Sequence, residues 1–344
     1  MNIHQHSTIH KRCKQFVQFI APEKDKIEDI KKQSAEIRER IKKKAEEDGK
    51  IVAEMPYSGS FGKNTGLRRY LRGSAEVEGM DIDLGFILEA KDDEGNELGC
   101  QIDDFESYAR ACYPDSDIGS TKSSATISFK STKRQYDLVP LLKTDNPDVQ
   151  KLIRTNGEER QSSIKKHAEF IKSRNRSSHR LQGVVVFNHC VRLIKWWRYH
   201  KQSESGIFGN EENDEKVPSF LLDLLCAHAY DKLSVTKTYP ETLARWFALM
   251  AHVVRNRKEI IFTDYIKFPR KPAYDVWLVA DPVDTSNNVV ANWHEYQVDE
   301  LAEWLESARD RMTQAIRMNG EGDDHGSLHC LVEIFGKVFK HNVD

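Results

Sequence analysis

The sequence predicts an α+β protein, in which a mixed sheet-and-helix part is followed by a helical part. Residues 80–88, 125–130 and 134–142 are short apolar runs bounded by glycines or polar turns, a pattern typical of strands. In the second half of the chain, apolar residues recur at helical spacing instead. This change of period predicts two domains, residues 1–155 and 156–344, with a ligand site in the cleft between them.

The elements of the first part follow from local patterns. Residues 22–47 predict a long amphipathic helix, because isoleucines recur at helical spacing among lysines and glutamates, and Gly49 suits its end. Residues 50–55 predict a short strand, and residues 102–112 predict a helix that ends before a proline. The polar segment 143–163 contains Asn-Pro and Asn-Gly pairs, which indicate a linker or lid.

The second part predicts a series of helices. They cover residues 164–175, 181–200, 219–233, 241–257, 298–318 and 327–340. Residues 203–216 are acidic and contain glycines, which predicts a loop between two of these helices.

Composition excludes several classes of protein. A chain of 344 residues is long enough for two packed domains. Its 52 basic and 54 acidic residues nearly cancel, which disfavours a constitutive binder of duplex nucleic acid. The six cysteines are scattered without a CxxC pair, as expected for reduced thiols in a cytosol. No apolar run approaches the roughly 20 residues that span a membrane, and the polar N-terminus lacks a signal-peptide pattern, so we expect a cytoplasmic protein without a membrane partner.

Three aspartates in the predicted strands indicate a metal-dependent site. Asp81 and Asp83 flank Ile82, so a strand turns both carboxylates to one face. Asp137 is embedded in another apolar run. Carboxylates that share a face repel one another, and two Mg²⁺ ions, or Mn²⁺ in their place, would resolve that conflict and serve an in-line phosphoryl displacement. Solvated acid pairs also occur on surface strands, but the apolar flanks here favour catalytic and metal-binding roles.

A Gly-Ser turn precedes the aspartate pair by about twenty residues. Gly59 would let backbone N–H groups approach a triphosphate, and the Ser60 hydroxyl would add a donor. Lys63 and Thr65 would add a charge and a further donor. A Gly-Ser pair by itself is equally typical of a plain turn, and its position before the aspartates is what favours a phosphate cradle.

The order of these motifs resembles the polymerase-β-type nucleotidyltransferases, because Gly-Ser and Asp-x-Asp precede an Asp followed by apolar residues and Pro140. Residues 191–197 and 217–222 resemble the helical domain of oligoadenylate synthases and cyclic GMP–AMP synthase. Residues 281–289 resemble an Asp-Pro-rich segment of oligoadenylate synthases and their bacterial relatives. Together these motifs resemble the bacterial CD-NTases, the cGAS/DncV-like and oligoadenylate-synthase-like enzymes of CBASS anti-phage signalling.

The resemblance implies a polymerase-β-like nucleotidyltransferase core with a C-terminal helical domain. It implies a cyclic di- or trinucleotide product containing adenine, with cyclic tri-AMP favoured, made from ATP alone or with a second NTP with release of pyrophosphate. It further implies that Lys195 contacts the triphosphate, that Ser219 hydrogen-bonds a phosphate and that Phe220 stacks on a base. An activating protein partner encoded nearby is also implied.

Each of these residues has a structural alternative. Lys195 lies beside two tryptophans and could extend along them, Ser219 could cap the following helix, and Phe220 could belong to the core. The Asx residues in 281–289 favour turns and caps over base selection. A basic stretch in residues 165–180 is read as a solvated helix face in preference to a rim that guides ATP.

Two departures from the family pattern matter. Asn64 stands where many relatives have glycine before Thr65, and no His/Cys cluster matches the zinc insertion of cyclic GMP–AMP synthase, so we expect no activation by double-stranded DNA. The alternative functions are a linear oligoadenylate synthase, a toxin-type nucleotidyltransferase acting on RNA or protein, and an inactive nucleotide-binding scaffold.

Overall fold

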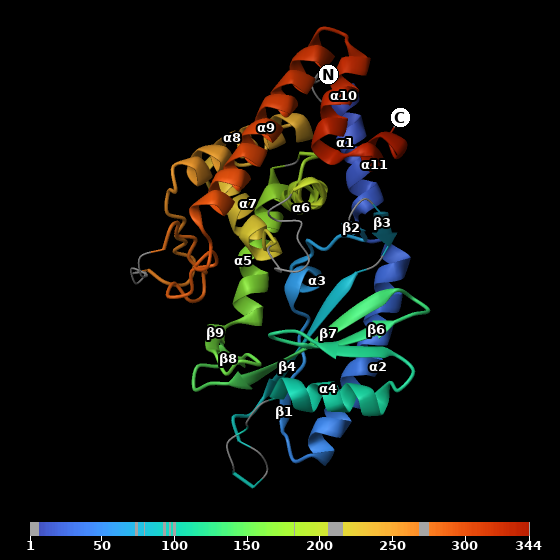
Figure 1. Cartoon of the computed structure of the whole chain (residues 1–344), viewed down its shortest axis with the longest axis vertical. Helices are drawn as coiled ribbons and strands as arrows, with labels where there is room; N and C mark the ends of the chain where they lie inside the picture. Colours follow the sequence, from blue (N-terminus) through green and yellow to red (C-terminus); the bar gives the residue numbers. More distant parts are fainter. Residues whose placement is uncertain are drawn as a thin grey trace. The chain divides into compact units, whose positions relative to one another are not determined.

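The computed structural model describes residues 7–72, 75–78, 80–91, 94–95, 98, 101–181, 183–205, 216–267 and 275–343. The chain forms two compact units (Figure 1). The sheet unit comprises Pro22–Arg68 and Glu78–Phe170, and the helical unit comprises Met1–Ala21, Arg69–Val77 and Ile171–Asp344. The units interleave along the chain, and the predicted boundary at residue 155 lies inside the sheet unit, which ends at Phe170.

The sheet unit contains a mixed sheet. Its main path runs, in order, through β1 (Val52–Glu54), β4 (Asp81–Leu88), β7 (Arg134–Lys143), β6 (Ala125–Phe129) and β5 (Asp117–Ser120). Strands β4 and β7 are parallel, whereas the other neighbours on this path are antiparallel. The strands predicted from the three apolar runs are confirmed, as is the α+β class.

One face of this sheet is the core. Ile82 on β4 lies opposite Tyr136 on β7, which lies opposite Ile127 on β6, and all three are fully buried. Helices α2 (Lys24–Glu47) and α4 (Gln101–Cys112) supply Ile37 and Phe105 to the same core cluster, so both helices cover this face. Because side chains alternate along a strand, the residues on either side of Ile82 must face away from that core.

The prediction of a linker over residues 143–163 is wrong. This segment forms a hairpin of β8 (Gln150–Ile153) and β9 (Glu159–Ser162), and β8 pairs with β7. Gly157 takes a positive φ of 80° at the turn. A hairpin at the margin of a sheet needs no apolar run, because backbone pairing holds it there, and composition therefore gave no strand signal.

The helical unit carries most of the remaining helices. They are α1 (Thr8–Ile20), α6 (Phe187–Glu204), α7 (Ser219–Leu233), α8 (Tyr239–Arg255), α9 (Glu295–Gly320), α10 (Asp324–Phe335) and α11 (Lys337–His341). Helix α5 (Ile164–Arg180) begins in the sheet unit and continues in the helical unit. Strands β2 (Arg69–Arg72) and β3 (Ala75–Glu78) form a separate two-stranded sheet. The single helix predicted over 327–340 is broken at Gly336, whose φ is 82°. Helix α1 was not predicted, and most of the predicted acidic loop at 203–216 lies outside the described residues. No helix in the described part of the chain is long and apolar enough to cross a membrane.

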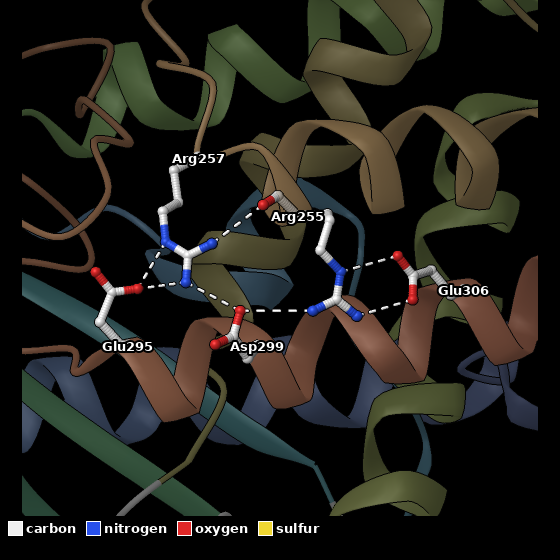
Figure 2. A network of polar contacts seen from close by, with 5 residues as sticks. All are labelled: Arg255, Arg257, Glu295, Asp299 and Glu306. Carbon is white, nitrogen blue, oxygen red and sulfur yellow. Dashed lines mark hydrogen bonds and ion pairs between the residues drawn. The ribbon is translucent and has the colours of Figure 1, made fainter.

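A network of ion pairs joins the end of α8 to α9 (Figure 2). Arg255 pairs with Glu306 at 2.8 Å and with Asp299 at 3.5 Å, and Arg257 pairs with the same Asp299 oxygen at 2.9 Å and with Glu295. Charges that share partners in one network contribute more to stability than isolated surface pairs do.

Candidate functional site

The three predicted aspartates lie on the sheet face opposite the core. Asp83 on β4 is directly in register with Asp137 on β7, and Asp137 is in register with Thr126 on β6. Asp81 is in register with Gln135, two residues before Asp137. The parallel pairing of two non-consecutive strands therefore brings together carboxylates that are more than fifty residues apart in the sequence.

The Gly-Ser turn packs against the aspartates of this sheet face. Helix α3 (Gly59–Lys63) begins there, and the Ser58 N–H donates to the backbone oxygen of Asp83 at 2.9 Å. Gly59 has a positive φ of 53°, and a Cβ atom at this position would lie 1.7 Å from Oδ2 of Asp83. Only glycine fits this approach, since both the backbone conformation and the carboxylate exclude a side chain.

The rest of the turn holds its shape through the backbone. The Thr65 N–H donates to the Ser60 carbonyl oxygen at 2.9 Å, and the Thr65 side chain is completely buried. Asn64 adopts the left-handed conformation with φ of 59°, which asparagine tolerates, so the turn closes without a glycine at this position. Lys63 is half-buried, and its positive charge lowers the pKa of Asp83.

Burial and mutual repulsion make the carboxylates reluctant to ionise. Burial, followed by the charges of Asp137 and Asp81, raises the pKa of Asp83 to about 7, although Lys63 acts in the opposite direction. Burial and the charge of Asp137 raise the pKa of Asp81 to about 6, but the Asp81 side chain lies at the exposed start of β4, where solvent weakens both effects. Burial also raises the pKa of Asp137, whereas hydrogen bonds from Thr126 and Gln135 lower it.

This donor set fits a hard divalent cation. Carboxylate oxygens are the ligands that Mg²⁺ prefers, and a cation would offset the burial and the repulsion that raise the pKa values of Asp81 and Asp83. In the side-chain positions described, no three His, Cys, Asp or Glu residues are gathered closely enough to hold one ion. Coordination of one ion by all three aspartates would therefore require some of their side chains to rotate.

In the helical unit, Lys195 on α6 is engaged in a buried ion pair. Its Nζ lies 2.7 Å from Oδ1 of Asp223 on α7, and both side chains are almost completely buried. Sequence reasoning missed Asp223, although an aspartate inside the apolar run of α7 is a signal for a buried partner.

Ser219 is the first residue of α7, and its Oγ accepts a hydrogen bond from Nη2 of Arg198 at 2.8 Å. Arg198 is buried and donates through Nη1 to the carbonyl oxygen of Val217 at 3.2 Å. Phe220 follows Ser219 and is half-buried. Arg198 lies one turn beyond Lys195 on the same helix and was not predicted from the sequence.

The Asx-rich segment 281–289 forms turns that are held together by hydrogen bonds. Oδ1 of Asp281 accepts from the N–H of Val283 at 2.8 Å, and Asn288 donates to Asp275 at 2.7 Å and to the Trp277 carbonyl oxygen at 2.8 Å. Asp281 and Asn288 are both buried. These contacts agree with the prediction of turns and caps.

The basic stretch includes one arginine with a structural role. Arg174 is buried, and its guanidinium bridges Asp231 at 2.6 Å and Asp264 at 3.1 Å. Lys165 and Lys166 lie 3.8 and 3.7 Å from Asp148. The exposed Lys165, Lys172, Arg176 and Arg180 agree with the predicted solvated helix face, whereas the buried Arg174 departs from it. Of the cysteines considered above, Cys100 lies outside the described residues.

Comparison with known proteins places this fold. Residues 8–175 match the family described as the Second Messenger Oligonucleotide or Dinucleotide Synthetase domain. A relative from Escherichia coli (strain MS 115-1), cyclic AMP-AMP-AMP synthase, is 27% identical over 265 residues, which are 75% of either chain. The solved structure of E. coli MS115-1 CdnC with ATP is similar with a TM-score of 0.76 and 24% identity, over 96% of this chain and 98% of that one. The CdnC:HORMA-deltaN complex is similar with a TM-score of 0.73 and 24% identity, over 96% and 99%.

The fold is thus that of these solved structures, with a polymerase-β-like core and a helical C-terminal part. Residues 8–175 carry a match to the second-messenger synthetase domain, and the chain as a whole is similar to the bacterial CD-NTases. The family resemblance and the fold predicted from the motifs are confirmed.

Proposed function

We propose that this protein joins ATP molecules into a cyclic oligonucleotide, with cyclic tri-AMP as the main product, for anti-phage signalling. The observation that carries the proposal is the row of Asp83 and Asp137 with Gly59 packed against it. The 27% identical relative named as a cyclic AMP-AMP-AMP synthase supports the choice of product.

In this proposal the sheet unit performs the transfer. Backbone N–H groups at Gly59, with Ser60 and Lys63, bind the triphosphate of the donor nucleotide at the start of α3. The attacking ribose hydroxyl loses its proton to Asp137 and forms a bond to the α-phosphorus, while the bond from that phosphorus to the pyrophosphate oxygen breaks. Mg²⁺ ions held by Asp81, Asp83 and Asp137 would supply charge neutralisation of the phosphates, and Mn²⁺ would serve in their place.

The helical unit supplies the remaining nucleotide contacts. Ser219 suits a phosphate, because its oxygen accepts from Arg198 and its own hydroxyl hydrogen is left to donate. Phe220 offers a half-buried ring to a base. Lys195 would serve a phosphate directly only by leaving Asp223, and otherwise contributes its charge from within the ion pair.

We also propose a protein activator. The complex of CdnC with HORMA-deltaN supports a protein partner for this chain, and the balance of 52 basic and 54 acidic residues supports independence from double-stranded DNA.

The test is incubation of the full chain with each NTP alone and with all four together, with Mg²⁺ or Mn²⁺, followed by phosphatase treatment and mass spectrometry. We expect one dominant phosphatase-resistant product from ATP alone, unchanged by duplex DNA. A ladder of phosphatase-sensitive oligomers that grows on addition of duplex RNA would identify a linear synthase. Transfer of a nucleotide to an added RNA or protein would identify a toxin-type nucleotidyltransferase. Nucleotide binding without any product, even with a co-encoded partner, would identify a scaffold.

A further inference from the structure

Asp137 accepts two side-chain hydrogen bonds, and both reach the same carboxylate oxygen. Thr126 Oγ1 donates to Oδ1 at 2.9 Å, and Gln135 Nε2 donates to Oδ1 at 3.2 Å. Among the described contacts of this side chain, none involves Oδ2. The carboxylate is therefore held by one oxygen while the other stays available.

The sheet itself places both donors. Thr126 is the residue of β6 directly in register with Asp137, and Gln135 precedes Asp137 by two positions on β7, so all three side chains share one face. The carboxylate torsion of aspartate is otherwise broad and nearly two-fold. Two donors that approach from a neighbouring strand and along the same strand remove that freedom.

We propose that Thr126 and Gln135 are positioning residues for the transfer reaction. Their hydrogen bonds hold Oδ1 of Asp137 and thereby leave Oδ2 for the reacting groups. An oxygen that already accepts two hydrogen bonds has little capacity for a further partner. Oδ2 is then the atom left to accept the proton when the ribose O–H bond breaks. This inference rests on the proposed catalytic role of Asp137.

The test uses side chains that separate shape from hydrogen bonding. Thr126→Val keeps the branched shape and removes the donor, whereas Thr126→Ser keeps the donor. Ser128→Val is the matched control, because Ser128 lies on the same strand and face, in register with Gln135. The measurements are kcat and KM for ATP, the melting temperature, and binding of Mn²⁺ to the ATP-bound protein followed by electron paramagnetic resonance.

We expect Thr126→Val and Gln135→Leu each to lower kcat, and to weaken Mn²⁺ binding, by about 10-fold, as loss of a supporting partner of a metal ligand typically does. The KM for ATP should change less than about twofold, and Thr126→Ser and Ser128→Val should retain kcat and Mn²⁺ binding. Equal losses in Thr126→Val and Ser128→Val would overturn the inference, as would normal kcat and Mn²⁺ binding in Thr126→Val and Gln135→Leu. Activity of Asp137→Asn would instead overturn the proposed catalytic role of Asp137, and a wild-type protein without a cyclic product would overturn the proposed function, so the failures are distinguishable.

Discussion

Asp83 lies directly opposite Asp137 across a parallel pair of strands, with Gly59 pressed against the Asp83 carboxylate. Two acids held side by side raise each other's cost of ionisation unless a cation accompanies them. This arrangement destabilises the cation-free protein, and several measurable consequences follow from it.

The double variant Asp81→Asn with Asp83→Asn should form no detectable cyclic product, because it removes two carboxylates proposed to hold the metal ions. It should remain folded, since loss of clustered charge relieves repulsion. Mass spectrometry and circular dichroism check the two parts. Asp117→Asn, an exposed aspartate on β5 that pairs with Lys130, is the control and should retain activity. Product from the double variant at the wild-type rate would refute the site.

Stability in metal-free buffer should depend on pH through Asp83. Its pKa is raised to about 7 in the folded protein, so the unfolded chain releases this proton first as pH rises, and folding stability falls between about pH 4 and pH 7. At pH 8, Asp83→Asn should therefore be more stable than wild type by roughly 1–4 kcal/mol of unfolding free energy. At pH 4 the two proteins should be equally stable. Mg²⁺ should narrow the difference at pH 8. Thermal melts with EDTA or Mg²⁺ measure this, and equal melting at pH 8 in EDTA would contradict it.

Gly59→Ala should abolish activity and lower stability. The positive φ costs roughly 1–2 kcal/mol for alanine, and the added Cβ would collide with Asp83 Oδ2. Gly157→Ala is the matched control, because Gly157 also has a positive φ but a Cβ there meets nothing within 4 Å. The control should lose similar stability while keeping its activity. If both variants stay active, the close approach at Gly59 is not required.

Phe220→Ala separates base stacking from packing. Loss of a stacking platform should weaken ATP binding by roughly 1–3 kcal/mol with a small change in melting temperature, as suits its half-buried ring. Loss of a core side chain would instead cost about 3–5 kcal/mol of stability. Calorimetric titration and thermal melts on one preparation decide between them, and unchanged affinity with a large drop in melting temperature would exclude stacking.

Lys195→Met should destabilise the helical unit by about 3–5 kcal/mol, because Asp223 would be left buried without its partner. The double variant Lys195→Met with Asp223→Leu should recover most of that stability. ATP affinity in the double variant then reports on the loss of the ion pair without the loss of stability. Weaker ATP binding in a stable double variant supports a phosphate role, and normal binding shows that the ion pair is purely structural.

Local pattern was sufficient for the elements that bury an apolar face. The runs at residues 80–88 and 134–142 became β4 and β7, and residues 219–233 became α7 with the predicted bounds, because a buried strand or helix must show its period in the sequence. The motif Asp81-Ile82-Asp83 was likewise sufficient to place two carboxylates on one strand face, since Ile82 is buried on the other.

Tertiary structure alone decided which distant residues meet. The register of β4, β7 and β6 puts Asp83 beside Asp137 and Asp137 beside Thr126, and no local pattern encodes a pairing between separate strands. For the same reason, the sequence did not predict the hairpin of β8 and β9 or the buried ion pair of Lys195 with Asp223. Backbone groups of polar residues can pair as those of apolar residues do, and the partner of a buried charge is decided by packing between helices, so both become visible only when the chain is folded.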